Sequence, residues 1–82
     1  MIVLDGHKKL IYEYMLRHGS ITGRDAYGKL KINDFTARIS DIRKSGIPVL
    51  DEWKVKKNLR GKVTRFKSYH IGDVSSMEIK LV

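Results

Sequence analysis

Hydrophobic residues in the first half of the chain recur at the spacing of helices. From about Asp5 to His18 an apolar stripe is formed by Leu10, Ile11, Tyr14 and Met15. Gly19 is expected to end this helix. A second, short helix should run to Leu30, because Thr22 and Asp25 at its start match a capping box. Its inward residues are expected to be Ala26, Leu30 and Tyr27.

The stretch INDFTARISDIRKSGIP, residues 32 to 48, predicts a third helix with a stop at each end. Asn33 is the expected N-cap, Gly46 follows the last turn, and Pro48 prevents continuation. The core side is formed by apolar residues spaced i, i+4 and i+7: Phe35, Ile39 and Ile42. The opposite side carries short or basic groups: Thr36, Ala37, Ser40 and Lys44.

Beyond Pro48 the pattern becomes nearly alternating, which is typical of strands. VLDEWKVKK and KVTRFKSYHI are rich in β-branched and aromatic residues and are separated by NLRG, so they predict a β-hairpin. Its inward residues are expected to be Trp53, Val55, Tyr69 and Ile71. Trp53 is expected to anchor the hairpin on the core, and a stacking platform for a base is the alternative for this residue. Phe66 has the opposite parity, which requires either a bulge or an exposed ring. The weakly alternating residues 72–82 could form an edge strand, an oligomerisation arm or a disordered tail.

Length and composition favour a binding module over an enzyme. Eighty-two residues make one domain with a modest core, too small for two lobes around a substrate cleft. The absence of cysteine excludes disulfides, thiolate nucleophiles and cysteine-type zinc sites. The apolar runs are too short to cross a membrane or to act as a signal peptide, so we expect an intracellular protein.

Positive charge is concentrated in the predicted hairpin. The chain has 17 Lys and Arg against 9 Asp and Glu, a formal net charge of +8. Seven of the basic residues fall between Lys54 and Lys67 without an acidic residue among them. A solvated surface would normally mix the two signs, so this excess indicates a polyanionic partner.

Three helices with a short turn between the second and third, followed by a hairpin, predict an α+β winged helix-turn-helix fold. In that fold the third helix keeps one face on the core and presents the other to the DNA major groove. We assign this domain to residues 1–71, with a two-stranded hairpin as the wing, and residues 72–82 to a C-terminal tail. Double-stranded DNA is therefore the expected partner.

The sequence also resembles a known family of small proteins. HGSIT, DAYGKLKINDFTARISDIRKSGIPV and the basic hairpin ending in SYHI are similar to winged helix-turn-helix proteins encoded by bacteriophages and prophages, over residues 7 to 71. The resemblance implies a sequence-specific DNA-binding protein of the bacterial cytoplasm, either a transcriptional regulator or a recombination accessory factor. Two residues depart from the pattern. Lys31 stands where such turns often have Gly. Asp34 brings an acid to the start of the recognition helix, where it could repel a phosphate or instead pair with Arg38.

Candidate DNA contacts follow from the orientation of the third helix and from the basic hairpin. The expected base-reading residues are Asn33, Thr36, Ala37 and Ser40. The expected backbone contacts are Lys31, Arg38, Arg43, Lys44, Lys54, Lys56, Lys57, Arg60, Lys62 and Arg65. For Arg38 and Arg43, which flank the core stripe, an intramolecular salt bridge is the alternative.

No set of residues predicts catalysis, a metal site or a cofactor. His7 and His18 lie about three helical turns apart, roughly 16 Å, which is too far to share one metal. Asp51 and Glu52 are adjacent on a strand, so their carboxylates point to opposite faces. We therefore expect no catalytic residue, no metal ligand and no cofactor.

The main alternative is an adaptor or inhibitor that binds a host protein through the same basic face. RNA binding is a third possibility, although no aromatic stacking motif supports it. A homodimer would need an apolar contact surface, for which the first helix and the tail are the evident sources. No membrane partner is expected.

Overall fold

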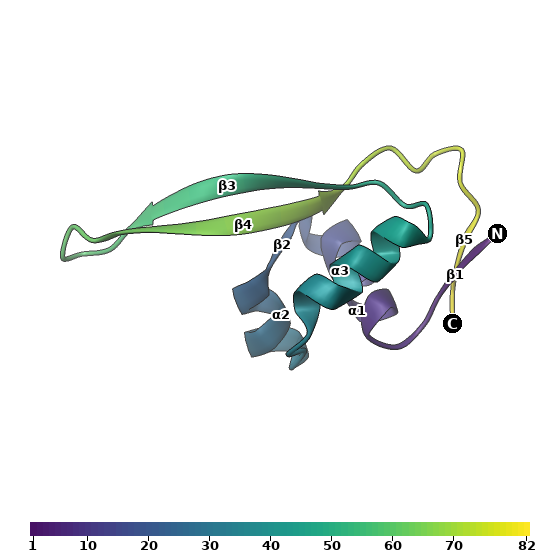
Figure 1. Cartoon of the computed structure of the whole chain (residues 1–82), viewed down its shortest axis with the longest axis horizontal. Helices are drawn as coiled ribbons and strands as arrows, with labels where there is room; N and C mark the ends of the chain where they lie inside the picture. Colours follow the sequence, from purple (N-terminus) through teal and green to yellow (C-terminus); the bar gives the residue numbers. More distant parts are fainter.

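The computed structural model describes all 82 residues as three helices and five strands (Figure 1). In chain order the elements are β1 (Ile2–Leu4), α1 (Gly6–His18), β2 (Ile21–Thr22), α2 (Gly23–Leu30), α3 (Phe35–Lys44), β3 (Val49–Lys57), β4 (Val63–Ile71) and β5 (Ile79–Leu81). The helices gather at one end, and the β3–β4 hairpin extends well beyond them, so the molecule measures 48 × 24 × 20 Å.

The helix boundaries follow from local capping chemistry. At the start of α2, the Thr22 hydroxyl accepts from the Asp25 N–H and the Asp25 carboxylate accepts from the Thr22 N–H, each at 3.1 Å, which confirms the predicted capping box. The prediction of Asn33 as the N-cap of α3 was wrong. The N-cap is Asp34, which makes no side-chain capping bond because its carboxylate is bound by the Arg38 guanidinium instead.

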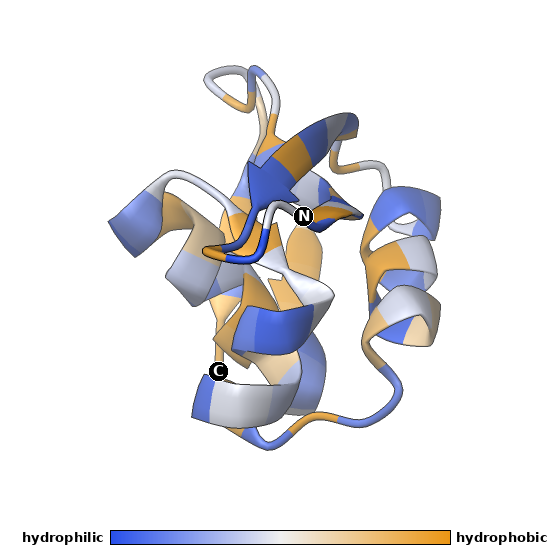
Figure 2. Ribbon diagram, turned by 90° about the vertical axis from the view of Figure 1, so that its left-hand side faces the viewer, coloured by the Kyte–Doolittle hydropathy of each residue, from blue (hydrophilic) through white to orange (hydrophobic).

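The core is formed by one face of each helix together with the base of the sheet. In Figure 2 the apolar segments of the helices lie mainly on their inner sides. As predicted, α3 buries three apolar residues: Phe35, Ile39 and Ile42. On α1 the buried face is rotated toward Tyr12, which packs inside with Ile11 and Met15, and Leu10 is exposed, contrary to the prediction. Tyr27 was also expected to point inward, but it is exposed, and Ala26 is the buried residue of α2.

The hairpin and β2 form a three-stranded antiparallel sheet in the order β2-β4-β3. The β3–β4 register runs without a bulge from Val49 opposite Ile71 to Lys57 opposite Val63, and Phe66 is half-buried. The prediction that Trp53 and Val55 point into the core was wrong, since their exposed fractions are 66% and 62%. Trp53 and Val55 lie on the face of the hairpin that is buried at its base, but at their positions the hairpin already extends beyond the helices.

A short turn closes the hairpin at its basic tip. The Asn58 side-chain oxygen accepts from the backbone N–H groups of Arg60 and Lys62, each at 2.9 Å. Gly61 has φ +78°, a left-handed conformation that glycine adopts without steric cost. The tip is therefore ordered by its own hydrogen bonds although all of its side chains are exposed.

The two ends of the chain pair with each other. β1 and β5 form a parallel two-stranded sheet in which Ile2 lies opposite Ile79 and Leu4 opposite Leu81. Leu4 is fully buried, so this sheet packs against the core. Of the alternatives for the tail, the structure has a short strand at residues 79–81.

Candidate nucleic-acid interface

The exposed side of α3 carries most of the residues expected to read bases. Burial of Phe35, Ile39 and Ile42 directs the opposite side of the helix outward. Thr36, Ala37 and Lys44 are exposed there, and Ser40 is half-buried. Asn33 is exposed in the loop just before the helix. These short side chains leave the helix backbone free to approach another surface closely.

Lys31 is exposed in the turn between α2 and α3. Lys31 adopts φ +59° and ψ +37° and is the only non-glycine residue with a positive φ. This conformation explains why glycine is common at the equivalent position of such turns. The Ile32 N–H donates to the Ala26 carbonyl at 2.9 Å across the turn, and Ile32 is buried, so the residue that follows Lys31 is fixed in place.

An acidic cluster lies along one flank of α3. The Arg38 Nη1 donates to Asp34 Oδ2 at 2.9 Å, which is one of the two alternatives for Asp34 in the sequence. The Arg38 Nε lies 3.0 Å from Asp41 Oδ2 without good hydrogen-bond alignment. His7 Nδ1 of α1 is 3.6 Å from the Asp34 carboxylate. The positive charge of Arg38 is thus largely matched by two carboxylates, which corresponds to the intramolecular alternative considered for this residue.

The other flank of α3 is joined to the base of the hairpin through Arg43. Its Nε and Nη2 donate to the Val49 carbonyl at 3.1 and 2.9 Å. Its guanidinium lies 5.8 Å from the centre of the Tyr69 ring, and Nη2 is 3.6 Å from Asp51 Oδ1. Tyr69 in turn packs edge-on against Phe35, with the ring centroids 5.2 Å apart. Arg43 therefore fixes the position of the hairpin relative to α3.

Asp51 connects Arg43 to the cationic surface of the hairpin. The Lys67 Nζ is 3.0 Å from Asp51 Oδ2 and 5.3 Å from the centre of the Trp53 ring. The hydrogen bond from Lys67, followed by the attraction of the Lys67 and Arg43 charges, holds the pKa of Asp51 below its ordinary value. Asp51 stays ionised and neutralises two cations at the base of the hairpin.

Toward the tip, the basic residues of the hairpin are exposed and have few acidic neighbours. The only ion pair among them joins Lys54 to Glu52 at 3.8 Å. The remaining exposed cations are Lys56, Lys57, Arg60, Lys62 and Arg65. This end of the hairpin therefore carries five positive charges without an ion-pair partner, which are available to bind phosphate groups.

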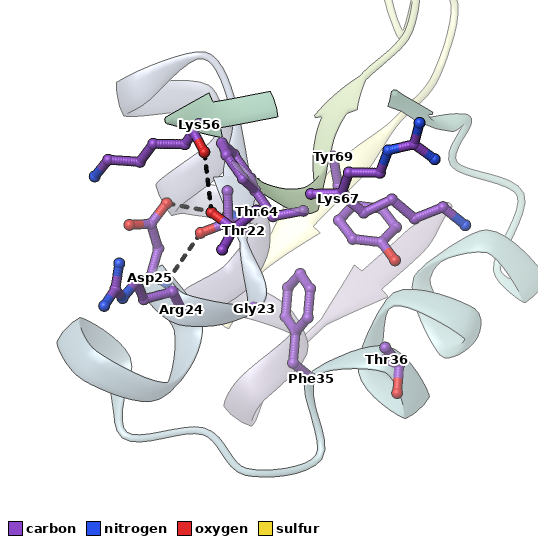
Figure 3. Close-up of a pocket in the computed structure, with 12 residues that line it drawn as sticks. Thr22, Gly23, Arg24, Asp25, Phe35, Thr36, Lys56, Thr64, Lys67 and Tyr69 are labelled. Carbon is purple, nitrogen blue, oxygen red and sulfur yellow. Dashed lines mark hydrogen bonds between the residues drawn. The ribbon is translucent and has the colours of Figure 1, made fainter. Parts of the chain in front are cut away.

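An open hollow of about 710 Å³ lies where α2, α3 and β4 meet (Figure 3). Thr22 to Asp25 line it from the start of α2, Phe35 and Thr36 from the start of α3, and residues of the hairpin close the third side. Four cations reach it: Arg24, Lys56, Arg65 and Lys67. Figure 3 shows the Phe35 ring directed into the hollow toward Tyr69, with Arg24 and Lys56 at its outer edge. Asp25 is the one acid in the lining, and the Thr22 N–H already bonds to its carboxylate.

The fold brings together much of the expected site but not all of it. Thr36, Lys56 and Arg65 share the hollow, and Lys44 lies farther along α3 at its C-terminal end. Arg24 and Lys67 are not among the residues that were predicted to contact DNA. Lys67 belongs to the basic run that was recognised, whereas Arg24 becomes visible only when α2 is placed beside the hairpin.

Metal-ligand clusters and membrane-spanning helices are both absent from the structure. No cluster of three or more metal-ligating side chains is present. None of the helices has the length and apolar character needed to span a bilayer.

Comparison with known proteins identifies the family. Residues 6–74 match the family model described as a winged helix-turn-helix domain. Neither the curated proteins nor the solved structures yielded a match to the chain. The matched region includes all three helices and the whole hairpin, and its class is α+β. DNA binding is the function that such a domain suggests. Because the model covers most of the chain, the protein belongs to the winged helix-turn-helix domain family.

Proposed function

We propose that the protein is a sequence-specific double-stranded DNA-binding protein in which α3 enters the major groove and the β3–β4 hairpin acts as the wing on the backbone. The observation that carries the proposal is the joint placement of the short-residue face of α3 and the cationic hairpin around one hollow. The resemblance to phage and prophage proteins supports a role as a transcriptional regulator or a recombination accessory factor. We propose a binding protein without catalytic activity.

The chemistry of α3 fits the groove. Thr36 and Ser40 can donate or accept hydrogen bonds at base edges, and Ala37 can contact a thymine methyl group. The acidic residues Asp34 and Asp41 lie on the flank away from the hairpin and are neutralised by Arg38. Their repulsion of phosphates is therefore weakened.

The hairpin supplies charge without sequence information. Lys and Arg contacts to phosphates position a protein on DNA and make its affinity depend on salt, whereas bases are read mainly by the residues in the groove. The Arg43 contacts with Val49 and Asp51 set the angle between these two parts.

Selection of bound sites from a random duplex library tests the proposal most fully. The parent protein should enrich one sequence, and Thr36→Ala or Ser40→Ala should change the preferred base pairs at a cost of about 1 to 3 kcal/mol per lost direct contact. Lys44→Ala is the matched control, since at the C-terminal end of α3 it should lower affinity for all sequences alike.

Two outcomes would contradict the proposal. Failure of the folded parent to enrich any sequence would remove sequence-specific recognition. If the Thr36 and Ser40 variants returned the parent's site at the parent's affinity, base reading by this face would be wrong, and a host-protein adaptor would become the better explanation of the basic surface.

A further inference from the structure

One face of the hairpin carries large apolar side chains that the core does not use. Trp53, Val55 and Val63 are 66%, 62% and 56% exposed. Directly opposed residues of an antiparallel pair share a face, and the register places Trp53 opposite Lys67, Val55 opposite Arg65 and Lys57 opposite Val63. These six residues form one continuous surface, which we call the hairpin strip.

The hairpin strip continues the surface that contacts α3. Asp51 and Tyr69 belong to the same face of the hairpin, one pair closer to its base. Asp51 is ion-paired with Arg43 of α3, and Tyr69 packs on Phe35 of α3. The hairpin strip is therefore on the side of the sheet that faces α3, but farther along the hairpin than the residues that α3 covers.

The charges of the hairpin strip restrict what can cover it. Lys57, Arg65 and Lys67 alternate with the apolar residues, and the nearest acid on that face, Asp51, is already bound to Lys67 and Arg43. A second copy of the chain on this surface would bring cations against cations. A partner must combine negative charge with apolar groups at close intervals, which is the chemistry of the sugar–phosphate backbone of a nucleic acid.

We propose that the hairpin strip packs against deoxyribose groups of the bound duplex, with Trp53 and Val55 on the sugar C–H surfaces and Lys57 and Arg65 on the flanking phosphates. This inference rests on the proposed DNA-binding function and adds to it an apolar contact. The apolar contact contributes affinity that does not depend on salt, unlike the phosphate contacts. The cation of Lys67 already lies over the Trp53 ring at 5.3 Å and holds the indole in place on the strip.

The chain contains a single tryptophan, so its fluorescence reports on the hairpin strip directly. Titration of the parent with duplex DNA should shift or quench the Trp53 emission. Trp53→Ala should raise Kd about tenfold, the factor that corresponds to removing roughly 60 Å² of buried apolar surface, while the slope of log K against log salt stays unchanged. Arg65→Ala should instead reduce that slope by about 0.9.

Leu50→Ala is the matched control. Leu50 lies on the same strand but on the opposite face, and 51% of it is exposed. It should leave both Kd and the slope at parent values. Thermal melts of each variant check folding, which Trp53→Ala should preserve because the side chain is mostly exposed.

The outcomes separate the two proposals. If the parent binds duplex DNA but Trp53→Ala binds equally well and the emission does not change, the hairpin strip does not contact DNA and only this inference fails. The same holds if Trp53→Ala converts a dimer to a monomer in sedimentation, because a second copy would then be the occupant. If the folded parent binds no duplex at all, the proposed function fails together with it.

Discussion

Replacing Lys31 by Gly should stabilise the protein and weaken its binding to DNA. Lys31 sits at φ +59°, and a left-handed conformation costs a non-glycine residue about 1 to 2 kcal/mol. Glycine loses about 0.4 to 1 kcal/mol more backbone entropy on folding, so the central value of the net gain in the free energy of unfolding is about 0.8 kcal/mol. The Lys31 side chain is exposed, so its removal leaves no cavity.

A thermal melt measures the first effect. For a domain of this size a gain of about 0.8 kcal/mol corresponds to a rise in Tm of roughly 3 to 6 °C. Lys31→Ala is the matched control because it removes the same charge and keeps the unfavourable conformation, so it should not raise Tm. Because Lys31 is one of the proposed phosphate contacts, both variants should weaken duplex binding and lower its salt slope by about 0.9. A lower Tm for Lys31→Gly than for Lys31→Ala would mean that the left-handed conformation of Lys31 does not destabilise the protein.

Three other predictions concern the core, the hairpin and the base of the hairpin. Ile39→Ala should lower the free energy of unfolding by roughly 2 to 4 kcal/mol in a denaturant titration, because it truncates a fully buried side chain. Ser40→Ala should barely change that free energy. The reverse order would mean that α3 is rotated about its axis. A variant with alanine at four exposed cations of the hairpin, Lys56, Lys57, Arg60 and Lys62, should bind all duplexes more weakly by about the same factor, and its affinity should depend less on salt. An unchanged salt slope in a folded variant would mean that the hairpin does not contact DNA. Because Lys67 lowers the pKa of Asp51, the stabilisation from this pair should be complete above pH 3.8 and disappear as the pH falls through the lower folded-state pKa. Asp51→Asn should abolish that part of the pH dependence of Tm, and an identical profile in the variant would show that the pair contributes nothing.

The three helices and the hairpin could be predicted from local signals in the sequence. The capping box at Thr22 and the spacing of Phe35, Ile39 and Ile42 are determined by residues within one or two helical turns, and both were predicted correctly. The pairing of β1 with β5 joins residues about 77 positions apart and has no local signal. Arg43 was considered for a salt bridge, but its bonds to Val49 depend on how α3 meets the hairpin.

The hairpin shows most clearly where a sequence pattern stops being informative. Alternation assigned Trp53, Val55 and Tyr69 to one face, and the register bears this out. Alternation cannot say how far the core reaches along a strand. Tyr69 is covered by α3, but the same face is open from Trp53 onward. An exposed tryptophan was therefore mistaken for a core anchor.

Joint binding of duplex DNA by α3 and the hairpin can be measured by fluorescence anisotropy. A labelled duplex is titrated with the parent protein at several salt concentrations. We expect binding in the micromolar range or tighter at low salt, with log K falling linearly with log salt by about 0.9 for each phosphate contacted. Absence of binding at low salt by a protein that still melts cooperatively, or binding that does not change with salt, would contradict DNA binding by α3 and the hairpin together.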